Sequence, residues 1–487
     1  MRVVVPISGE NLSFLSEFPA AWPKVFVCPE ALRDSALGPS LARLAPGCTV
    51  VWVPPHGRGP ASAVIAAVRA DPRCLPDDDP VLVSCGGLDL RWDPDDFEAF
   101  TRGTACDAAV LCYAGFHPMH LRPTERTSCR VEGGRVLEIG VQSHPADDPA
   151  RECTAPGSYF VRTGALLKRA CEAAMGDGSR ADRCESDACD WMVREGLDVR
   201  AHPIQCFLRL STPEDLGEYE YWAKAFDGQA VVPGRSAASG LQILMPMAGR
   251  GSRFGEGTPK PFRPVLGRPM FRAALDHLPP AAHQVLVVRA DMEDEARRLA
   301  PGAELVALPG VTEGQAITCA AGAHRLDPDL PVLVSNSDHG MVWDDDRWLA
   351  LLAEAPDVVV WGQRGYPGTQ RKPSAFAYIE PRPGTDRVGK VSVKAPLSEN
   401  PREDLLLAGT FWFRRPSLLT DAVRELVARN LRVNGEFYLD SVAGICADRG
   451  LDVRVFEANG FLCWGTPEAL AEFGWWHRWF TRFARSA

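Results

Sequence analysis

The segment PVLVSCGGLDLRWDPDDFEAF, residues 80–100, returns with few changes as PVLVSNSDHGMVWDDDRWLAL at residues 331–351, so the two copies start 251 residues apart. Two further pairs follow in the same order. GSYFVRTGALL and GTFWFRRPSLL start 252 residues apart, and GLDVRAHPIQCFLRLSTPEDLGEY and GLDVRVFEANGFLCWGTPEALAEF start 254 residues apart. Nearly constant spacing over such a distance indicates a tandem duplication of one domain.

The chain of 487 residues is long enough for two domains of this size. Within each copy, short β-branched runs such as VLVSN and VVVW alternate with helical stretches such as PSLLTDAVRELVARN. This alternation predicts an α/β fold with two tandem Rossmann-like domains, each a mainly parallel mixed sheet flanked by helices. Glycine, serine, alanine and proline replace the periodic pattern in DGQAVVPGRSAASG, which is typical of a linker. The predicted organisation is a first domain over 1–226, a linker over 227–240 and a second domain over 241–487.

The composition is that of a globular protein, with 46% hydrophobic residues, 24% charged residues and a formal net charge of -10. A general nucleic-acid binder would be basic, so we expect no nucleic-acid partner. The chain begins with a very short apolar run and nowhere approaches about 18 uninterrupted apolar residues, so we expect neither a signal peptide nor a membrane span. The 15 cysteines form no pair of CxxC motifs, which favours reduced thiols in a cytoplasmic protein.

The second copy opens on an expected strand, LQILMP, which runs directly into the loop MAGRGSRFGEGTPKPFRPVLGRPM at residues 247–270. Ligands of a parallel sheet bind at the carboxyl ends of its strands. Glycine amides at such an end let a polyphosphate approach the backbone, which a Cβ would obstruct. Arg253 and Lys260 add positive charge beside these glycines. The loop therefore predicts a phosphate-binding site.

This loop resembles the signature of the sugar-phosphate nucleotidylyltransferases, which is close to G-x-G-[ST]-R followed by P-K and by P-V-x-G-[KR]-P-M. The resemblance implies a GT-A-like Rossmann fold and extends from about Leu241 to Phe473, with EGQA, NSDHG, VSVKAP, AGTFWF and NGEFYLD following in the family's order. The catalytic residues that it implies are Arg253, Lys260, Asp338 and Lys394. The implied nucleotide-binding residues are Ala248, Gly249, Gly251, Ser252 and Gln315, and the implied acceptor-binding residues are Gly409, Glu436 and Lys394.

The resemblance also implies a role for several of these residues. Asp338 binds a catalytic Mg²⁺, Gln315 contacts the base, and Lys394 contacts the acceptor phosphate. An oxygen of that phosphate attacks the α-phosphorus of an NTP, and pyrophosphate leaves. Because the acceptor phosphate is already ionised near neutral pH, the site needs to position the reactants and neutralise charge rather than supply a base.

One position departs from the family pattern. The family carries a second magnesium aspartate in a D-x-G-T string, and this chain has Cys463 at that place, in LCWGTP. Magnesium prefers oxygen ligands, so a thiol is a poor substitute. We expect Asp440, Glu436 or solvent to complete the metal shell.

The first copy lacks the residues with these roles. PISGENLSF leads almost directly to AWPKVFVCPE without a phosphate loop, and Lys24 in the second string aligns with the strand that follows the loop. By the same spacing Asp338 corresponds to Gly87, Lys394 to Gln142 and Gln315 to Pro60. We therefore expect a non-catalytic first domain that covers apolar surface on the second or builds a homo-oligomer.

The C-terminal string EFGWWHRWFTRF interleaves aromatic and basic residues, as a helix at a membrane surface does. Its counterpart in the first copy is EYEYWAKAF. Because the element is present in both copies, packing against the domain itself or a subunit interface is the better interpretation.

The sequence as a whole predicts an enzyme whose substrates are an NTP and a small phosphorylated acceptor. The first hypothesis is Mg²⁺-dependent nucleotidyl transfer to a sugar 1-phosphate, which gives an NDP-sugar and pyrophosphate for surface polysaccharide synthesis. A cytidylyltransferase acting on phosphocholine or a phosphonate would share the loop and the metal site. A non-catalytic regulator that binds sugar nucleotides is the third hypothesis, and these alternatives stay open at this point.

Overall fold

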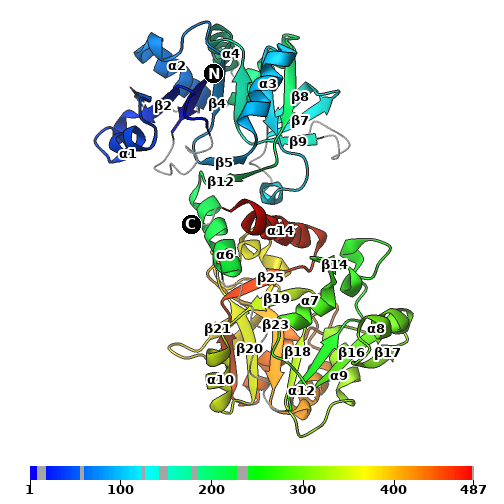
Figure 1. Cartoon of the computed structure of the whole chain (residues 1–487). Helices are drawn as coiled ribbons and strands as arrows, with labels where there is room; N and C mark the ends of the chain where they lie inside the picture. Colours follow the sequence, from blue (N-terminus) through cyan, green and yellow to red (C-terminus); the bar gives the residue numbers. More distant parts are fainter. Residues whose placement is uncertain are drawn as a thin grey trace. The chain divides into compact units, whose positions relative to one another are not determined.

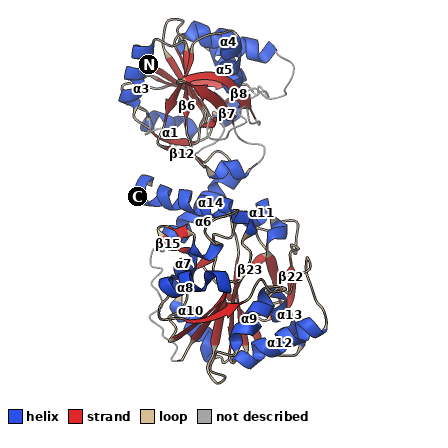
Figure 2. Cartoon of the chain, turned by 90° about the vertical axis from the view of Figure 1, so that its right-hand side faces the viewer, coloured by secondary structure: helices blue, strands red, loops and turns tan. Residues whose placement is uncertain are grey.

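The computed structural model describes residues 1–7, 18–54, 60–122, 127–141, 152–176, 185–227 and 240–484 (Figure 1). The chain divides into two compact units, Met1–Tyr219 and Glu220–Ala487. Helices flank the strands in each unit (Figure 2). Residues 228–239, most of the predicted linker, lie outside the described residues, so that assignment stays a prediction.

The first unit is built on one large mixed sheet. Its strand order is β3-β2-β1-β4-β10-β6-β11, continued by β8-β7-β9, and β5 pairs with β12 separately. The strands are β1 Arg2–Pro6, β2 Lys24–Pro29, β3 Thr49–Val53, β4 Val81–Ser84, β5 Leu88–Arg91, β6 Ala108–Cys112, β7 Thr127–Glu132, β8 Arg135–Val141, β9 Glu152–Ala155, β10 Ser158–Val161, β11 Val199–Pro203 and β12 Cys206–Arg209. The helices are α1 Leu37–Leu44, α2 Pro60–Ala70, α3 Pro94–Thr104, α4 Gly164–Gly176, α5 Glu185–Arg194 and α6 Pro213–Asp227.

The second unit has a large sheet of order β17-β16-β13-β18-β23-β20-β24, with β21 and β22 paired beside β23. Its strands are β13 Gln242–Pro246, β14 Pro264–Val265, β15 Arg268–Pro269, β16 His283–Arg289, β17 Glu304–Leu308, β18 Val332–Ser335, β19 His339–Val342, β20 Val358–Gln363, β21 Ala377–Pro381, β22 Val388–Val393, β23 Leu405–Phe413, β24 Val453–Glu457 and β25 Gly460–Cys463. Its helices are α7 Met270–Asp276, α8 Glu293–Leu299, α9 Gln315–Ala323, α10 Asp345–Ala353, α11 Pro367–Arg371, α12 Pro416–Ala428, α13 Asp440–Asp448 and α14 Pro467–Arg478.

Seven strands follow the same order in the two sheets, which differ in where the remaining strands attach. The correspondence is β1 with β13, β2 with β16, β3 with β17, β4 with β18, β10 with β23, β6 with β20 and β11 with β24. The small pair β5–β12 corresponds to β19–β25. In both sheets the first four strands in this series are parallel, and the fifth, β10 or β23, is antiparallel to its neighbours. This confirms the predicted α/β fold and supports the duplication.

Central strands are buried on both faces because helices cover both sides of a mainly parallel sheet. All residues of β4, β6, β18 and β23 are buried. This explains why these segments read as continuous apolar runs rather than as alternating ones. The core of the second unit gathers apolar side chains from these central strands and from α9, α12 and α13.

Equivalent hydrogen bonds place the two copies in register at the level of single residues. The amide of Leu210 donates to the carbonyl of Gly87 at 2.7 Å, and the amide of Trp464 donates to the carbonyl of Asp338 at 2.8 Å. Gly87 therefore occupies the place of Asp338, as the spacing predicts, and supplies no carboxylate there.

A buried ion pair is repeated in both copies and was not predicted from the sequence. Arg122 binds Glu218 at 2.6 Å, and Arg371 binds Glu472 at 2.5 Å. The two glutamates are 4% and 1% exposed, so each pair fixes its helix, α6 or α14, against a preceding turn.

Helix α6 crosses the division between the units, and its residues 220–227 belong to the second. Trp222 stacks on Trp476 of α14 with ring centroids 6.2 Å apart, and Phe226 lies 5.8 Å from Phe473. The aromatic residues of α14 are thus packed inside the unit, as the repeat argument favoured. Among the residues that the structure describes, none of the helices has the length and apolar character that a membrane crossing needs.

Candidate active site

A cavity of about 630 Å³ opens at the carboxyl ends of β13 and β18. This is the edge at which parallel sheets bind ligands. Most of the residues implied by the resemblance line this cavity: Ala248, Gly249, Gly251, Ser252, Arg253, Lys260, Gln315, Asp338 and Glu436. Lys394 and Gly409 do not line it.

The glycine-rich loop folds against its own second half. Gly251 has φ +63°, a left-handed conformation that favours glycine. A Cβ at this position would lie 2.9 Å from the Cβ of Lys260, so a side chain would push the lysine away. Arg253 is exposed on the short turn Ser252–Phe254 and has no carboxylate partner among the described residues. Its charge is therefore available to a ligand in the cavity.

Two arginines hold the carbonyl groups of this loop. Arg289, at the end of β16, donates to the carbonyl of Gly249 at 2.6 Å while its other nitrogens bind Asp291 at 3.0 and 2.9 Å. Arg263 donates to the carbonyls of Phe254 at 2.8 Å and Thr258 at 3.1 Å. Sequence analysis missed both residues, because a bond to a backbone carbonyl leaves no residue-type pattern. Bonds to these carbonyls fix the loop in one conformation.

Lys260 and Asp338 form a direct ion pair inside the cavity. Burial opposes ionisation of the Asp338 carboxyl. The charge of Lys260 and a hydrogen bond from His339 outweigh that effect, so the pKa of Asp338 lies well below its usual range. The ring of buried His339 is oriented by Thr410, whose Oγ1 lies 2.9 Å from its Nε2. The carboxylate is therefore charged at neutral pH.

Cys463 lies beside this carboxylate. It ends β25 and is paired with His339 of β19 in the antiparallel register. Burial and the nearby charge of Asp338 raise the pKa of the Cys463 thiol to about 11. The group is thus a neutral thiol at physiological pH, which is a poor magnesium ligand. A Cβ at Gly465 would lie 3.1 Å from Oδ2 of Asp338, so this glycine keeps the carboxylate accessible.

Lys394 follows β22 directly and does not line the cavity. Its φ of +62° is unusual for a lysine, and its amide donates to the carbonyl of Phe376 at 3.0 Å. Its Nζ donates to the carbonyl of Ala375 and lies 5.3 Å from the centre of the Tyr438 ring. Burial lowers the pKa of Lys394, and the charge of Asp440 opposes this shift. The ammonium group is therefore held beside the site rather than extended into solvent.

Asp440 begins α13 and is the carboxylate that most strongly affects Lys394. Burial raises the pKa of Asp440 to about 6, against the attraction of Lys394. The second predicted carboxylate, Glu436, lines the cavity itself. Among the residues that the structure describes, no three His, Cys, Asp or Glu side chains gather to hold a metal ion by themselves. A metal here would need ligands from substrate or water as well.

The EGQA segment is fixed against the chain before α13. Gly314 has φ +139°, and a Cβ there would lie 2.5 Å from the backbone nitrogen and oxygen of Phe437. The amide of Phe437 donates to the carbonyl of Glu313 at 2.9 Å. Gln315 follows at the start of α9, and its side-chain amide donates to Asn336.

Gly409 supports this same asparagine from behind. It lies in the middle of β23 with φ +75°, and a Cβ there would lie 2.4 Å from Nδ2 of Asn336. The glycine therefore makes room for a cavity residue and does not itself face the cavity. The first unit repeats this contact, since a Cβ at Gly157 would lie 2.7 Å from Sγ of Cys85.

The matching positions of the first unit carry no comparable charges where the structure describes them. Gly87 replaces Asp338, and Pro60 begins α2 at the place where Gln315 begins α9. Lys24 is the first residue of β2, the counterpart of β16, and its Nζ donates to the carbonyl of Pro19 at 2.8 Å. Gln142 and residues 8–17 lie outside the described residues.

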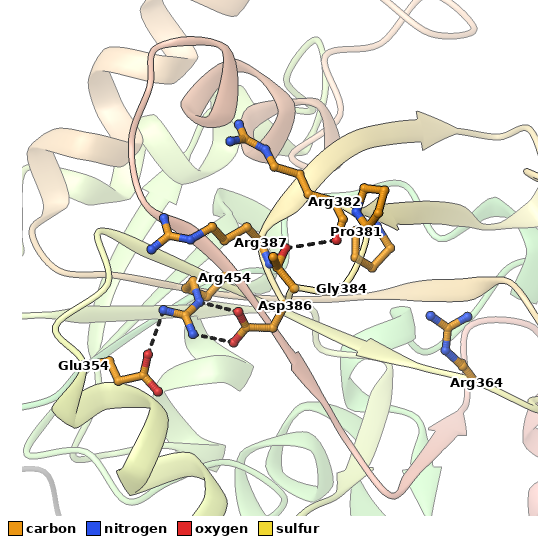
Figure 3. Close-up of a pocket in the computed structure, with 10 residues that line it drawn as sticks. Glu354, Arg364, Pro381, Arg382, Gly384, Asp386, Arg387 and Arg454 are labelled. Atoms are coloured by element: carbon orange, nitrogen blue, oxygen red, sulfur yellow. Dashed lines mark hydrogen bonds and ion pairs between the residues drawn. The ribbon is translucent and has the colours of Figure 1, made fainter.

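A second pocket, of about 830 Å³, lies at the tip of the β21–β22 hairpin (Figure 3). Arg454 lines this pocket. It binds both oxygens of Asp386 at 2.7 Å and Glu354 at 2.9 Å. Arg387 binds Asp452 at 2.6 Å. Because carboxylates pair with both arginines, we interpret these residues as ion pairs that stabilise the hairpin and not as a ligand site. They lie at the tip of the hairpin, and Lys394 follows its other end.

The chain is similar in sequence to known nucleotidyltransferases. Residues 244–389 match the family model of the MobA-like NTP transferase domain. The 2-C-methyl-D-erythritol 4-phosphate cytidylyltransferase of Nocardia farcinica is 35% identical over 115 residues, which cover 23% of this chain and 46% of that protein. The chain thus spans less than half the length of this relative.

Two solved structures align with about half of the chain. The nucleoside-diphosphate-sugar pyrophosphorylase from Vibrio cholerae is 22% identical, with a TM-score of 0.39, over 47% of this chain and 98% of its own. The inositol-1-phosphate CTP transferase from T. maritima is 15% identical, with a TM-score of 0.36, over 48% of this chain and 95% of its own.

Proposed function

We propose, from the MobA-like NTP transferase domain that the second unit contains, that this protein transfers a nucleotidyl group from an NTP to a small phosphorylated acceptor. The first candidate acceptor is a sugar 1-phosphate, and the products are then an NDP-sugar and pyrophosphate for surface polysaccharide synthesis. The observation that carries the proposal is the single cavity that unites the glycine-rich loop, Arg253, Lys260 and Asp338.

The reaction needs no proton transfer at the attacking atom. An oxygen of the ionised acceptor phosphate forms a bond to the α-phosphorus, and the bond from that phosphorus to the bridging oxygen of pyrophosphate breaks. The electron pair of the broken bond leaves with pyrophosphate. Donor and acceptor are both anions, so the barrier includes their mutual repulsion. The work of the protein is to hold the two phosphates in line and to neutralise charge.

Each charged side chain has a place in this scheme. Arg253 and the loop amides hold the β- and γ-phosphates, Lys260 lies between donor and acceptor, and Lys394 approaches the acceptor phosphate. Each such contact contributes on the order of 3 kcal/mol to the transition state. The bonds that Arg289 makes to the loop allow the amides to act without reorganising.

Asp338 is the residue that would hold Mg²⁺. A magnesium ion in such sites uses one or two carboxylates, substrate phosphates and water, which fits one ionised carboxylate in the cavity, and Gly465 leaves room beside the Oδ2 that Lys260 binds. When bound, Mg²⁺ supplies positive charge at the α-phosphate. Glu436 and Asp440 are the nearby carboxylates that remain as further candidates, since Cys463 is a neutral thiol.

A second candidate is a cytidylyltransferase with a different acceptor, such as phosphocholine or a phosphonate. The relative from Nocardia farcinica is named a cytidylyltransferase, which favours CTP as the donor. Both candidates use the same loop and the same metal-binding carboxylate.

The test is pyrophosphate release by the full chain. Each of the four NTPs and dTTP would be combined with Mg²⁺ and with sugar 1-phosphates, phosphocholine or a phosphonate in turn. Release that depends on both an NTP and a sugar 1-phosphate supports the first candidate, and release only with CTP and another acceptor supports the second. Binding of NTP or sugar nucleotide without release under any pairing would identify a non-catalytic regulator instead.

A further inference from the structure

Tyr221 reaches from helix α6 to the strand beside the candidate metal-binding residue. Its phenol donates to the carbonyl of Phe461 at 2.8 Å, and the amide of Phe461 donates to the phenol oxygen at 2.9 Å. One hydroxyl thus satisfies both backbone groups of a residue in β25. Tyr221 belongs to the second unit, although it precedes the segment that matches the NTP transferase domain.

These two bonds matter because, among the strands that the structure describes, β25 pairs with β19 alone. Without the Tyr221 hydroxyl, the amide and carbonyl of Phe461 would lose the partner that it supplies to both, which is costly in a buried strand. Aromatic contacts add to the bond. The Tyr221 ring lies 5.8 Å from Tyr366, which in turn packs edge-on against Phe461 at 5.3 Å.

A short backbone path connects this strand to Asp338. Cys463, two residues after Phe461, is paired with His339, the neighbour of Asp338. The amide of the next residue, Trp464, donates to the carbonyl of Asp338 at 2.8 Å. A shift of β25 along or away from β19 would therefore move the main chain that carries the Asp338 carboxylate.

In the first unit, a histidine outside α6 bonds the carbonyl at the matching position. Phe207 of β12 corresponds to Phe461. The carbonyl oxygen of Phe207 lies 3.2 Å from Nε2 of His117, and the two rings stack with their centroids 4.0 Å apart. His117 precedes the proline that begins a turn, as Tyr366 precedes Pro367 of α11. In the second unit, however, the carbonyl of Phe461 is bonded by Tyr221. The second unit thus bonds this carbonyl from α6, whereas the first unit bonds it from the turn that begins at Pro118.

We propose that Tyr221 is a positioning residue of the active site, which fixes β25 and, through Trp464, the main chain at Asp338. The inference rests on the proposed function, because the geometry that Tyr221 is said to preserve is the geometry needed for metal-dependent nucleotidyl transfer. Tyr221 touches neither the cavity nor the reacting groups, so its effect is on geometry rather than on chemistry.

Tyr221→Phe in the full chain removes the hydroxyl and keeps the ring. Hydrogen exchange followed by mass spectrometry would report on peptides that cover residues 460–465. We expect faster exchange of the amides of Phe461 and Trp464 in the variant. We also expect the Mg²⁺ concentration that gives half-maximal pyrophosphate release to rise about fivefold, because the loss of both hydrogen bonds affects the metal site only indirectly, by about the net contribution of one bond. The KM for NTP should stay within about twofold, because the glycine-rich loop is untouched.

Phe226→Leu is the matched control, since Phe226 also docks α6 on α14 but makes no bond to β25. It should lower thermal stability and leave the Mg²⁺ requirement unchanged. The inference is wrong if Tyr221→Phe leaves exchange at 460–465 unchanged, if exchange rises without a change in the Mg²⁺ requirement, or if Phe226→Leu shifts that requirement equally. Absence of pyrophosphate release by the wild-type chain with any substrate would instead contradict the proposed function, and the exchange measurement would still decide whether Tyr221 fixes β25.

Discussion

At the scale of single residues, Asp338 combines two properties that a metal-binding carboxylate needs. Lys260 and His339 keep it ionised against the cost of burial, and the lack of a side chain at Gly465 leaves room beside its Oδ2, the oxygen that Lys260 binds. A carboxylate with its pKa held this low does not lose its charge in the pH range of an enzyme assay. Its removal should therefore affect the reaction at every pH that can be tested.

Asp338→Ala should lower kcat for pyrophosphate release at least about a hundredfold, because it removes the candidate metal anchor. The side chain is 23% exposed, so the fold should survive the change. Initial rates at saturating Mg²⁺ and a thermal unfolding curve measure both effects. Asp346→Ala, an exposed carboxylate on α10, is the control and should change neither. A variant at Asp338 with near wild-type turnover would remove this residue from the mechanism.

Lys394→Ala should act through the acceptor. Its ammonium lies beside Tyr438 and Asp440 rather than at the glycine-rich loop, so we expect at least a tenfold rise in the KM for the acceptor or an equal fall in kcat. NTP affinity, measured by calorimetry without acceptor, should change little. Lys390→Ala, exposed on the same strand β22, controls for loss of charge. Collapse of NTP binding with unchanged acceptor kinetics would contradict the role.

Asp440 makes stability depend on pH. Its folded-state pKa of about 6 lies above its ordinary value of 3.8, so the folded state holds this proton more tightly than the unfolded state. The contribution to stability is present below pH 4 and is lost as the pH rises through 6. Asp440→Asn should therefore gain about 2–3 kcal/mol relative to wild type between pH 4 and pH 7.5, measured by urea unfolding. Equal differences at both pH values would show that the carboxyl titrates normally.

At the scale of elements, the glycine-rich loop and the strands that carry it were well predicted from sequence. The strand into Pro246 follows from the apolar run LQILMP and the glycines after it, which are local signals. The supports of the loop were not predicted. Arg289 and Arg263 bind carbonyl groups, which every residue carries, so no residue-type pattern marks the partner, and for Arg289 that partner lies forty residues away along the chain.

Arg289→Ala should loosen the loop at Gly249. We expect the KM for NTP to rise at least tenfold, since a short charge-assisted hydrogen bond to the loop is lost. The KM for the acceptor should change less, because Lys394 is held by another element. Arg297→Ala is the control, an arginine of α8 that pairs with Glu293 on its own helix. Equal effects of the two substitutions on NTP would mean that Arg289 contributes only general charge.

At the scale of the whole molecule, the duplication was visible in the sequence because strand order, turns and terminal helix recur at nearly constant spacing. The end of the first domain was harder to predict. The sequence argument placed it at residue 226, whereas the compact units divide after Tyr219. The reason is physical: the periodic pattern of α6 continues to Asp227, but Trp222 and Phe226 on its last turns pack against α14. Periodicity identifies a helix and does not say which core it joins.

Truncated chains should separate what α6 contributes to the second unit from what the first copy contributes to nucleotide binding. A chain of residues 241–487 loses Trp222, which is fully buried on Trp476, and with it Tyr221 and Phe226. Deleting one large buried aromatic side chain costs about 3–5 kcal/mol, so this chain should unfold at clearly lower urea concentration than residues 220–487 and release pyrophosphate more slowly.

Residues 1–226 alone should bind no NTP at millimolar concentrations, because Gly87 supplies no carboxylate and the sequence contains no second glycine-rich loop. Equal stability of the two longer chains would show that α6 is dispensable, and nucleotide transfer by residues 1–226 would show that the first copy has kept its activity.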